Sequence, residues 1–383
     1  MNVVFVSNYF NHHQRALCES LYNMTNKNFT FIATSEMRKE RKDLGYGEKN
    51  IPDYVKFSYV DEDNRILCQK IIDDADVVIA GSAPEYMLKK RIRYNKLTFR
   101  YSERLLKNGK EIIKFIPHYF IWHLRNPFSK SLYLLCAGAY TYADYKKYGL
   151  FKNKSYKWGY FPAVRNYADV DKMISEKIPN SILWCGRFID WKHPEIAVYI
   201  AKDLKKAGFC FKLSMIGNGV LKNYLEELIK NEHLEDCVQI LDAMKPDEIR
   251  DYMEQTEIFL FTSDRKEGWG AVLNEAMNSG CAVVASHAIG SVPYLIEDEK
   301  NGLICESCNI DDFYRKTEIY LKNPNLRLQL SKQAYKTIID KWNAETAASA
   351  FLDLAKGILS EETYILPESG PCSRAAVLND DWR

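Results

Sequence analysis

The sequence predicts an α/β protein built from two doubly wound parallel-sheet domains. First, its 383 residues are more than one hydrophobic core usually holds, so two domains of ordinary size are expected. Second, short unbroken apolar runs alternate with amphipathic stretches, which is the pattern of repeated strand–helix units. Third, several of the apolar runs end in polar loops that contain glycine, as the ligand-binding edges of parallel sheets do.

The first half is expected to form one sheet, with buried strands at residues 3–7, 29–33, 76–80, 97–101 and 132–137. The loop Asn8-Tyr-Phe-Asn-His-His-Gln14 follows the first strand and contains no glycine, which argues against a nicotinamide cofactor in this half. A helix is expected over residues 14–22. The turn at residues 158–162 and the polar linker after it place the N-terminal domain at residues 1–165.

The second half is expected to form another sheet, with strands beginning near residue 181 and at residues 212–216, 238–241, 258–261 and 281–286. Helical patterns follow at residues 311–321, 326–341 and 345–359. We therefore predict a C-terminal domain at residues 166–345 and a helix at residues 346–360 that crosses back to the N-terminal domain. Pro367, Gly370 and Pro371 argue against a packed element in the tail at residues 361–383.

The composition is that of a globular protein, with 46% hydrophobic and 27% charged residues. The formal net charge of +2 gives no global electrostatic case for nucleic-acid binding. The chain has no apolar run approaching ~18 residues and no signal-peptide pattern at its start, so a cytoplasmic location is expected. The ten cysteines are interpreted as small core residues of a protein in a reducing compartment. The pair Cys305-x-x-Cys308 alone predicts neither a zinc site nor a redox motif.

Residues 258–305 carry the strongest functional signal, because they read as strand, polar loop, helix and strand. Glu267 lies in the loop and Glu275 in the helix, so two carboxylates can flank one pocket at the carboxyl end of the first strand. Gly268 and Gly270 allow backbone amides to approach a ligand closely. The alternative interpretation is an ordinary crossover whose carboxylates are solvated.

The run Glu267-Gly-Trp-Gly-Ala-Val-Leu-Asn-Glu275 resembles the E-x7-E segment of family 4 retaining glycosyltransferases. Those enzymes have the GT-B fold, in which two Rossmann-like domains face each other across a cleft. The resemblance implies that Glu267 and the backbone after it hold the donor sugar, and that Glu275 accepts hydrogen bonds from the ribose hydroxyls. The donor-binding residues implied at this segment are Gly268, Trp269, Gly270, Leu273, Asn274 and Glu275.

A second segment of the chain also resembles that family. Gly186-Arg187 and Lys192 resemble the G-R-x4-K segment of that family, whose Arg and Lys bind the donor diphosphate; the alternative is a surface Arg and Lys near a turn. Gly217, in a glycine turn after a strand, is a further donor-side candidate. The turn Ala288-Ile-Gly290-Ser-Val-Pro293 departs from the family pattern because Tyr294 stands where Glu is common, so no catalytic role is assigned there.

Acceptor-side candidates come from the loops of the first half. Asn11 and His13 follow the first strand, and Arg104 follows the strand at residues 97–101. The catalytic candidates are Glu267, His12 and Glu103, and the acceptor of the reaction's proton stays open among Glu267, His12 and the donor phosphate. The alternatives are that one histidine caps the helix while the other is solvated, and that Glu103 and Arg104 form a surface pair.

Residues 89–130 are strongly basic and contain the aromatic segment Phe115-Ile-Pro-His-Tyr-Phe-Ile-Trp122. This combination suits the anionic inner-membrane surface, at about 1 kcal/mol per nearby charge. The alternatives are a solvated basic face and single-stranded nucleic acid; no nucleic-acid partner is expected because no binding module accompanies the stretch. The basic residues are Lys89, Lys90, Arg91, Arg93, Lys96, Arg100, Arg104, Lys107, Lys110, Lys114, Arg125 and Lys130.

Taken with the resemblance, these features predict a glycosyltransferase that moves a sugar with retention from a nucleotide-diphospho-sugar to a glycan or lipid-linked acceptor. Bacterial capsule, exopolysaccharide or O-antigen synthesis is the expected setting. No cofactor and no metal are expected, since Asp61 and Asp63 do not follow an apolar strand as a metal-binding Asp-x-Asp motif does. The alternatives are a non-hydrolysing sugar-nucleotide epimerase and a non-catalytic nucleotide-binding partner subunit.

Overall fold

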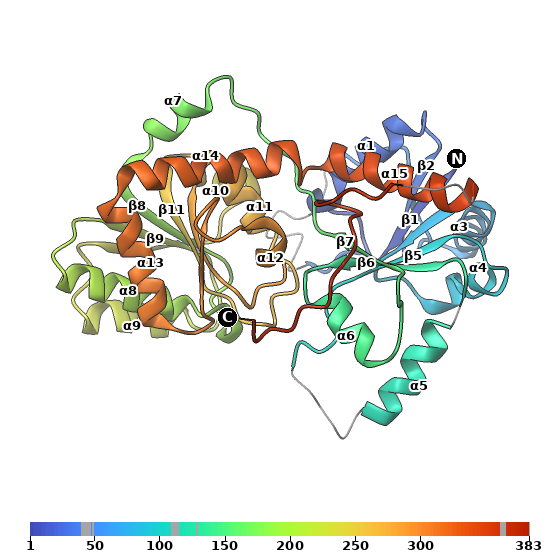
Figure 1. Ribbon diagram of the computed structural model, residues 1–383, viewed down its shortest axis with the longest axis horizontal. Helices are drawn as coiled ribbons and strands as arrows, with labels where there is room; N and C mark the ends of the chain where they lie inside the picture. Colours follow the sequence, from blue (N-terminus) through green and yellow to red (C-terminus); the bar gives the residue numbers. More distant parts are fainter. Residues whose placement is uncertain (40–46, 48–49, 109–114, 128, 361–364, 383) are drawn as a thin grey trace. The chain divides into compact units, whose positions relative to one another are not determined.

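The computed structural model describes residues 1–39, 47, 50–108, 115–127, 129–360 and 365–382. The chain forms two compact units (Figure 1). Unit 1 comprises Met1–Ala163 and Trp342–Asn379, and unit 2 comprises Val164–Lys341 and Asp380–Arg383. Each unit contains one sheet of parallel strands, which confirms the prediction of two doubly wound domains. Within the described ranges, no helix combines the length and the apolar character needed to span a membrane.

The described strands of unit 1 form a sheet in the order β3-β2-β1-β4-β5-β6-β7. β1 is the unbroken apolar run Val3–Ser7, buried along its whole length as a central parallel strand must be. The chain order reverses between β1 and β4, the kind of switch point where such sheets bind ligands. The other strands are β2 (Phe29–Ala33), β3 (Val55–Phe57), β4 (Val77–Ala80), β5 (Thr98–Ser102), β6 (Leu132–Ala137) and β7 (Ser155–Trp158).

Two helices of unit 1, α1 and α3, begin at polar caps. Asn11 caps α1, accepting a hydrogen bond from the His13 amide at 3.0 Å. Asp61 caps α3, accepting from the Asn64 amide at 2.7 Å, so the acids near residue 61 serve a helix start. α15 lies beside α1 (Figure 1). The described helices are α1 (His12–Met24), α3 (Glu62–Asp74), η1 (Glu85–Met87), α4 (Lys89–Arg93), α5 (Phe115–Arg125), α6 (Thr141–Lys147) and α15 (Ala344–Ser360).

Unit 2 has a sheet in the order β10-β9-β8-β11-β12-β13, with its switch point between β8 and β11. Ile258 to Phe261 pair in register with Ala282 to Ala285, as the predicted strand–helix–strand unit requires. β13 was not predicted from the sequence because it is only three residues long. The strands are β8 (Ile178–Cys185), β9 (Lys212–Ile216), β10 (Val238–Leu241), β11 (Thr256–Phe261), β12 (Ala282–Ser286) and β13 (Leu303–Cys305).

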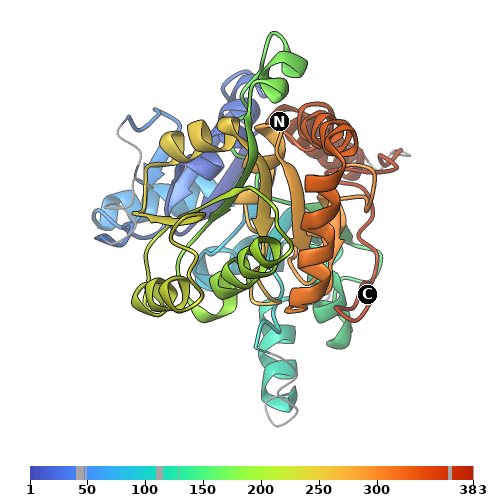
Figure 2. The ribbon, with the colours of Figure 1, turned by 90° about the vertical axis from the view of Figure 1, so that its left-hand side faces the viewer.

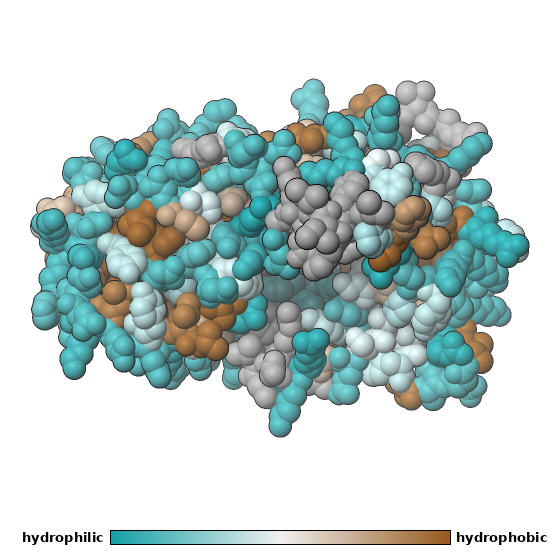
Figure 3. Space-filling view, turned by 90° about the horizontal axis from the view of Figure 1, so that it is seen from below, coloured by the Kyte–Doolittle hydropathy of each residue, from teal (hydrophilic) through white to brown (hydrophobic). Residues whose placement is uncertain are grey.

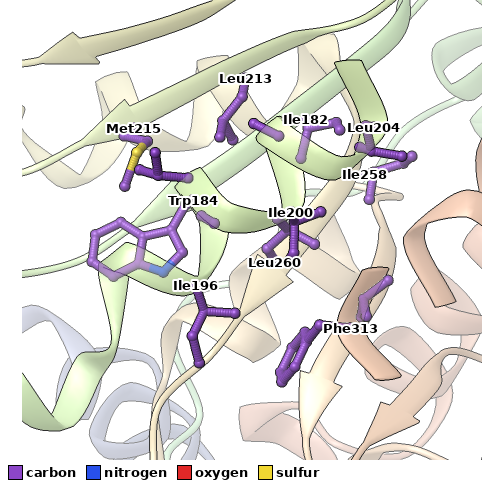
Figure 4. Packing of buried hydrophobic residues seen from close by; sticks show 14 of the residues in the cluster. Ile182, Trp184, Ile196, Ile200, Leu204, Leu213, Met215, Ile258, Leu260 and Phe313 are labelled. Atoms are coloured by element: carbon purple, nitrogen blue, oxygen red, sulfur yellow. The ribbon is translucent and has the colours of Figure 1, made fainter. Parts of the chain in front are cut away.

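One face of this sheet packs against α8 and α13, which lie side by side (Figure 2). Alternate residues of β8, β9 and β11 point to this face, where α8 supplies aliphatic side chains that include Ile196, Ile200 and Leu204, and α13 supplies Phe313 (Figure 4). The helices are α7 (Val170–Ser175), η3 (Asp190–Lys192), α8 (Pro194–Lys206), α9 (Lys222–Asn231), α10 (Pro246–Gln255), α11 (Val272–Asn278), α12 (Val292–Leu295), α13 (Ile310–Lys322) and α14 (Pro324–Asp340).

The C-terminal tail has irregular backbone, yet part of it packs on the sheet of unit 1. Around an antiparallel bridge between Tyr156 and Arg374, the Lys157 amide donates to the Ser373 carbonyl and the Cys372 amide donates to the Lys157 carbonyl, both at 2.8 Å. Cys372 is completely buried. The expectation that the prolines and glycine would prevent packing is therefore wrong for residues 370–375, because backbone pairing with the β7 edge satisfies their polar groups.

Candidate functional site in each unit

A polar pocket of about 540 Å³ opens in unit 1 at the carboxyl ends of β1, β4 and β5. It lies at the switch point of this sheet, where parallel sheets bind ligands. The predicted Asn11, His13 and Glu103 all line it. Residues that the sequence analysis did not assign to the acceptor side complete the wall, namely Asn8, Ser82, Glu85, Arg100, Asn126 and Tyr160 among others.

The charged groups of this pocket are held by neighbours from distant parts of the chain. Glu103 accepts a hydrogen bond from the Tyr160 hydroxyl at 2.7 Å and also pairs with Lys107. Arg100 donates to both carboxylate oxygens of Glu85, at 3.0 and 2.7 Å. Such a bidentate pair is geometrically rigid, so the pocket wall is preorganised.

Arg104 and His12 are placed differently from the other acceptor-side candidates. The Arg104 side chain is 2% exposed, lies 3.4 Å from an Asp144 carboxylate oxygen and sits over the Tyr140 ring. It is not among the residues that line the pocket, so its charge serves the fold of unit 1. His12 begins α1 and its ring lies 3.9 Å from that of His13, but only His13 lines the pocket. Neither histidine is the cap, which is Asn11.

In unit 2, the loop after β8 and the loop after β11 meet through a salt bridge. Lys192 pairs with Glu267, and both side chains are nearly buried. The Ser263 hydroxyl donates to the same Glu267 oxygen at 3.2 Å. These residues lie beyond the carboxyl ends of the two strands at the switch point, so the G-R-x4-K and E-x7-E segments form one site.

Trp191 joins both predicted cations in this site, and the sequence prediction did not include it. The Arg187 guanidinium lies 5.6 Å and the Lys192 ammonium 4.9 Å from the centre of its ring. Arg187 is exposed. The indole thus presents an exposed guanidinium beside the Lys192–Glu267 pair. We call Arg187, Trp191, Lys192 and Glu267 the unit 2 cluster. An aromatic residue between two cations in the G-R-x4-K segment was the available sequence signal.

Gly217 brings two loops of unit 2 into backbone contact. A Cβ at this position would lie 1.9 Å from the Gly186 carbonyl oxygen, and φ is +158°. The Gly186 amide donates to the Ile216 carbonyl at 3.0 Å. Only glycine permits this approach, which places the backbone of Gly217 next to the loop that carries Arg187.

The segment between the two glutamates is largely buried. Gly270 has φ +83°, and a Cβ there would come within 2.4 Å of the Phe261 ring. The Trp269 indole donates to the Asn274 side-chain oxygen at 2.9 Å, and these two side chains, like that of Leu273, are inside unit 2. None of these three predicted donor-site residues exposes its side chain. Gly268 is also buried.

Glu275 lies on α11, and burial raises the pKa of its carboxyl to about 7. The positive charges of Arg250 and Arg165 act in the opposite direction. In water, the pKa of a glutamate carboxyl lies well below neutrality. A carboxyl whose surroundings raise its pKa to near neutrality is typical of binding and catalytic sites.

Comparisons with known proteins agree with this arrangement. Residues 170–337 match the family model "Glycosyl transferases group 1". The amylovoran biosynthesis glycosyltransferase AmsK of Erwinia amylovora is 35% identical over 129 residues, which are 32% of this chain and 31% of that protein. A Campylobacter jejuni N-acetylgalactosamine-N,N'-diacetylbacillosaminyl-diphospho-undecaprenol 4-alpha-N-acetylgalactosaminyltransferase is 34% identical over 170 residues, 44% of this chain and 42% of that protein. The chain spans between about a third and a half of the length of the curated relatives it matches.

The crystal structure of Anabaena Alr3699/HepE in complex with UDP superposes with a TM-score of 0.69 over 93% of this chain and all of that one, at 13% identity. This chain has the GT-B fold. The likeness extends over both units, so it supports the expectation for the first half of the chain, where the sequence motifs were weakest.

Proposed function

We propose that this chain is a retaining glycosyltransferase of family 4 that uses a nucleotide-diphospho-sugar donor. The observation that carries the proposal is the unit 2 cluster, in which Arg187, Lys192 and Glu267 converge at the switch point of a GT-B unit. We infer the retention of configuration, the family and the donor class from the match of these residues to the motifs of that family.

The cluster suits the chemistry of the leaving group. When the bond between the sugar and the diphosphate breaks, negative charge builds on the β-phosphate. Arg187 can bind that phosphate through two parallel N–H donors, and Lys192 supplies a point charge that Glu267 already orients. Glu267 then contacts the donor sugar, and Glu275 accepts from the ribose. These cations perform the charge stabilisation in the proposed mechanism.

The unit 1 pocket is the proposed acceptor site. Its wall combines the Tyr101, Trp122 and Tyr160 rings with paired charges, a mixture that suits the alternating apolar faces and hydroxyl edges of a sugar. Glu103 is held at one carboxylate oxygen by Tyr160 and lies in position to accept from an acceptor hydroxyl. Relatives named for amylovoran biosynthesis and for a diphospho-undecaprenol substrate favour a glycan or lipid-linked acceptor in bacterial surface polysaccharide synthesis.

α5 supports contact with an anionic membrane surface. Phe120 and Leu124, one helical turn apart, are 64% and 82% exposed. Figure 3 shows hydrophobic (brown) patches scattered among hydrophilic (teal) surface in both units, so the exposure of these two side chains carries the argument. Exposed Lys89, Arg93 and Arg125 line a groove of about 460 Å³ with Leu124. Cations beside exposed apolar groups are what interfacial helices use.

Three basic residues of the predicted membrane stretch serve the fold instead. Arg91, Arg100 and Arg104 are buried in unit 1. Arg91 donates to the carbonyls of Ile72, Ala75 and Leu97, each at 2.7 Å. Lys110 and Lys114 lie outside the described residues. The positive surface is therefore smaller than the composition of the stretch suggested.

The membrane proposal can be tested by co-sedimentation with vesicles of phosphatidylcholine containing about a third phosphatidylglycerol. We expect the double variant Phe120→Ser, Leu124→Ser to bind at least about fivefold more weakly than the wild type, because it loses two inserting side chains. Val220→Ser, which removes an apolar side chain of unit 2 that is 87% exposed, is the control. Equal binding of all three proteins would exclude α5 as the contact.

The activity is tested by incubating the purified protein with UDP-, GDP- and dTDP-sugars, with and without a membrane lipid extract. We expect one donor to release its nucleoside diphosphate, and the release to rise with lipid. Arg187→Ala should lower the rate at least tenfold while leaving the circular dichroism spectrum unchanged. Epimerised donor without release would indicate an epimerase, and binding without turnover would indicate a non-catalytic subunit.

A further inference from the structure

A second constellation of chemically active side chains lies in unit 2 next to the unit 2 cluster, since its His193 directly follows Lys192. Cys308 is exposed, between β13 and α13, and is one of ten cysteines that all carry free thiols. Its sulfur lies 3.5 Å from Nε2 of His193. Its backbone is left-handed, with φ +60°. A cysteine rarely adopts this conformation without support from its surroundings.

Three side chains contact the His193 ring, namely two carboxylates and the Cys308 thiol. Nδ1 lies 2.9 Å from a Glu195 carboxylate oxygen, and Nε2 lies 3.5 Å from an Asp264 carboxylate oxygen as well as from the Cys308 sulfur. The Thr262 hydroxyl lies 2.9 Å from the His193 carbonyl, which fixes the ring's backbone. The cluster therefore contains a thiol nucleophile, a ring nitrogen beside it and carboxylates that orient the ring. Activated cysteines have the same arrangement.

The electrostatics of the cluster favour an ion pair between the ring and the thiol. Hydrogen bonds from the ring to Asp264, Cys308 and Glu195 raise the pKa of His193 to about 11, so the ring is cationic at neutral pH. The hydrogen bond from His193 in turn lowers the pKa of the Cys308 thiol from its ordinary value. Burial and the charge of Asp264 act on the pKa of the Cys308 thiol in the opposite direction, and Lys266 in turn lowers the pKa of Asp264.

We propose that Cys308 is a reactive thiolate and a site of mixed-disulfide formation with low-molecular-weight disulfides, activated by His193. The Cys308 sulfur attacks one sulfur of the disulfide, a new S–S bond forms, and the old S–S bond breaks. The electron pair of that bond leaves on the second sulfur as a thiolate, and His193 keeps its proton throughout. The Cys308 sulfur is oxidised and the departing sulfur is reduced, so the low-molecular-weight disulfide is itself the oxidant and no other is needed. The proposal is independent of glycosyl transfer.

The other exposed cysteine supplies an internal reference. Cys210 is exposed like Cys308, and its carbonyl accepts a hydrogen bond from the Asn180 side chain. The buried cysteines have thiols with raised pKa where a shift is resolved, as burial alone raises that of Cys136. Reaction at those positions should be slow for lack of access.

The experiment treats the full chain with 5,5'-dithiobis(2-nitrobenzoate), follows release of the coloured thiolate, and identifies the modified peptide by mass spectrometry. At pH 6 we expect Cys308 to react at least about tenfold faster than Cys210. From pH 8 to pH 6 the rate at Cys308 should fall much less than the roughly 80-fold expected of an ordinary thiol. Equal rates at Cys308 and Cys210, or a full 80-fold fall, would overturn the proposal.

Three variants identify the cause. Cys308→Ser should abolish the fast phase. His193→Gln should slow it at least about tenfold at pH 6, with the rate recovering at high pH, where the thiol ionises unaided. His233→Gln is the matched control, because His233 is an exposed histidine of the same unit that also has positive φ, +55°. If His193→Gln misfolds, Glu195→Gln tests the same link with a smaller expected effect. An unchanged rate in a folded His193→Gln protein would overturn the role of the ring.

Discussion

The switch points of the two units differ in how their charged side chains are arranged. In unit 1, Arg100 is held by Glu85, and Glu103 is held by Tyr160 and Lys107, around a pocket of about 540 Å³. In unit 2, Lys192 and Glu267 pair while Arg187 stays exposed on Trp191. An exposed cation beside an oriented ion pair suits a charged ligand, whereas a wall of paired charges suits a neutral one. This difference supports the proposed placement of the donor in unit 2 and of the acceptor in unit 1.

The largest expected effect concerns the cations of unit 2. Lys192→Ala should lower turnover about 10²–10³-fold, since it removes a preorganised charge at the leaving group and leaves Glu267 without its partner. The measurement is nucleoside diphosphate release under saturating donor. Lys206→Ala, at an exposed lysine of α8, is the control and should keep wild-type activity. A loss below about threefold at Lys192 would remove the unit 2 cluster from the mechanism.

The second prediction concerns the half-buried carboxyl of Glu275. Its pKa in the folded protein, about 7, lies above the ordinary value of 4.5, so its contribution to stability is complete below about pH 4.5 and is lost as pH rises through 7. Glu275→Gln cannot ionise. Between pH 5 and pH 8, we expect the wild type to lose up to about 3 kcal/mol of unfolding free energy relative to this variant, measured by urea unfolding. A constant difference across that range would contradict the prediction.

The third prediction separates backbone strain from close contact in unit 2. Gly270 and Gly208 have nearly the same φ, +83° and +82°, but only a Cβ at Gly270 would meet another residue, the Phe261 ring. We expect Gly208→Ala to cost about 1 kcal/mol and Gly270→Ala to cost about 2 kcal/mol more. Thermal unfolding of both variants measures the difference. Equal costs would mean that the Phe261 ring moves aside freely.

The smallest expected effect concerns the acceptor pocket. Glu103→Gln keeps the side-chain shape and removes the charge that pairs with Lys107, so transfer should fall about tenfold, while nucleotide affinity measured by UDP titration should not change. Glu19→Gln, which breaks an exposed pair with Arg15 on α1, is the control. A parallel loss of UDP affinity in Glu103→Gln would overturn the division of roles between the units.

Much of the fold could be predicted because parallel strands buried on both faces are unbroken apolar runs. Residues 3–7, 29–33 and 212–216 were predicted with the bounds that the structure shows. The short strands β3, β7 and β13 were missed, since β3 and β13 have only three residues and a lysine interrupts both β3 and β7. The packed tail was missed for another reason. It is held by backbone pairing with β7, which does not require an apolar run.

The candidate site also has features that the sequence predicted and features that it did not. Two motifs that are each contiguous in the chain indicated Arg187, Lys192, Glu267 and Glu275, because short loops after parallel strands keep their residues together at one sheet edge. For Trp191 the only local signal was an aromatic residue between two cations, and nothing local indicated that Arg100 pairs with Glu85. For Trp269 and Asn274, the motif was recognised, but the burial of their side chains was not.

By itself, the sequence determined the two sheets, their order of elements and the positions of the donor-side motifs, since these depend on local apolar periodicity and on spacing within single loops. Only the tertiary structure decided which charges are paired. Glu103 meets Tyr160 across 57 positions and Cys308 meets His193 across 115, through packing that spacing along the chain does not encode. Whether a side chain is a ligand, a base or a structural partner depends on such neighbours, because burial and opposing charge set its pKa and its exposure.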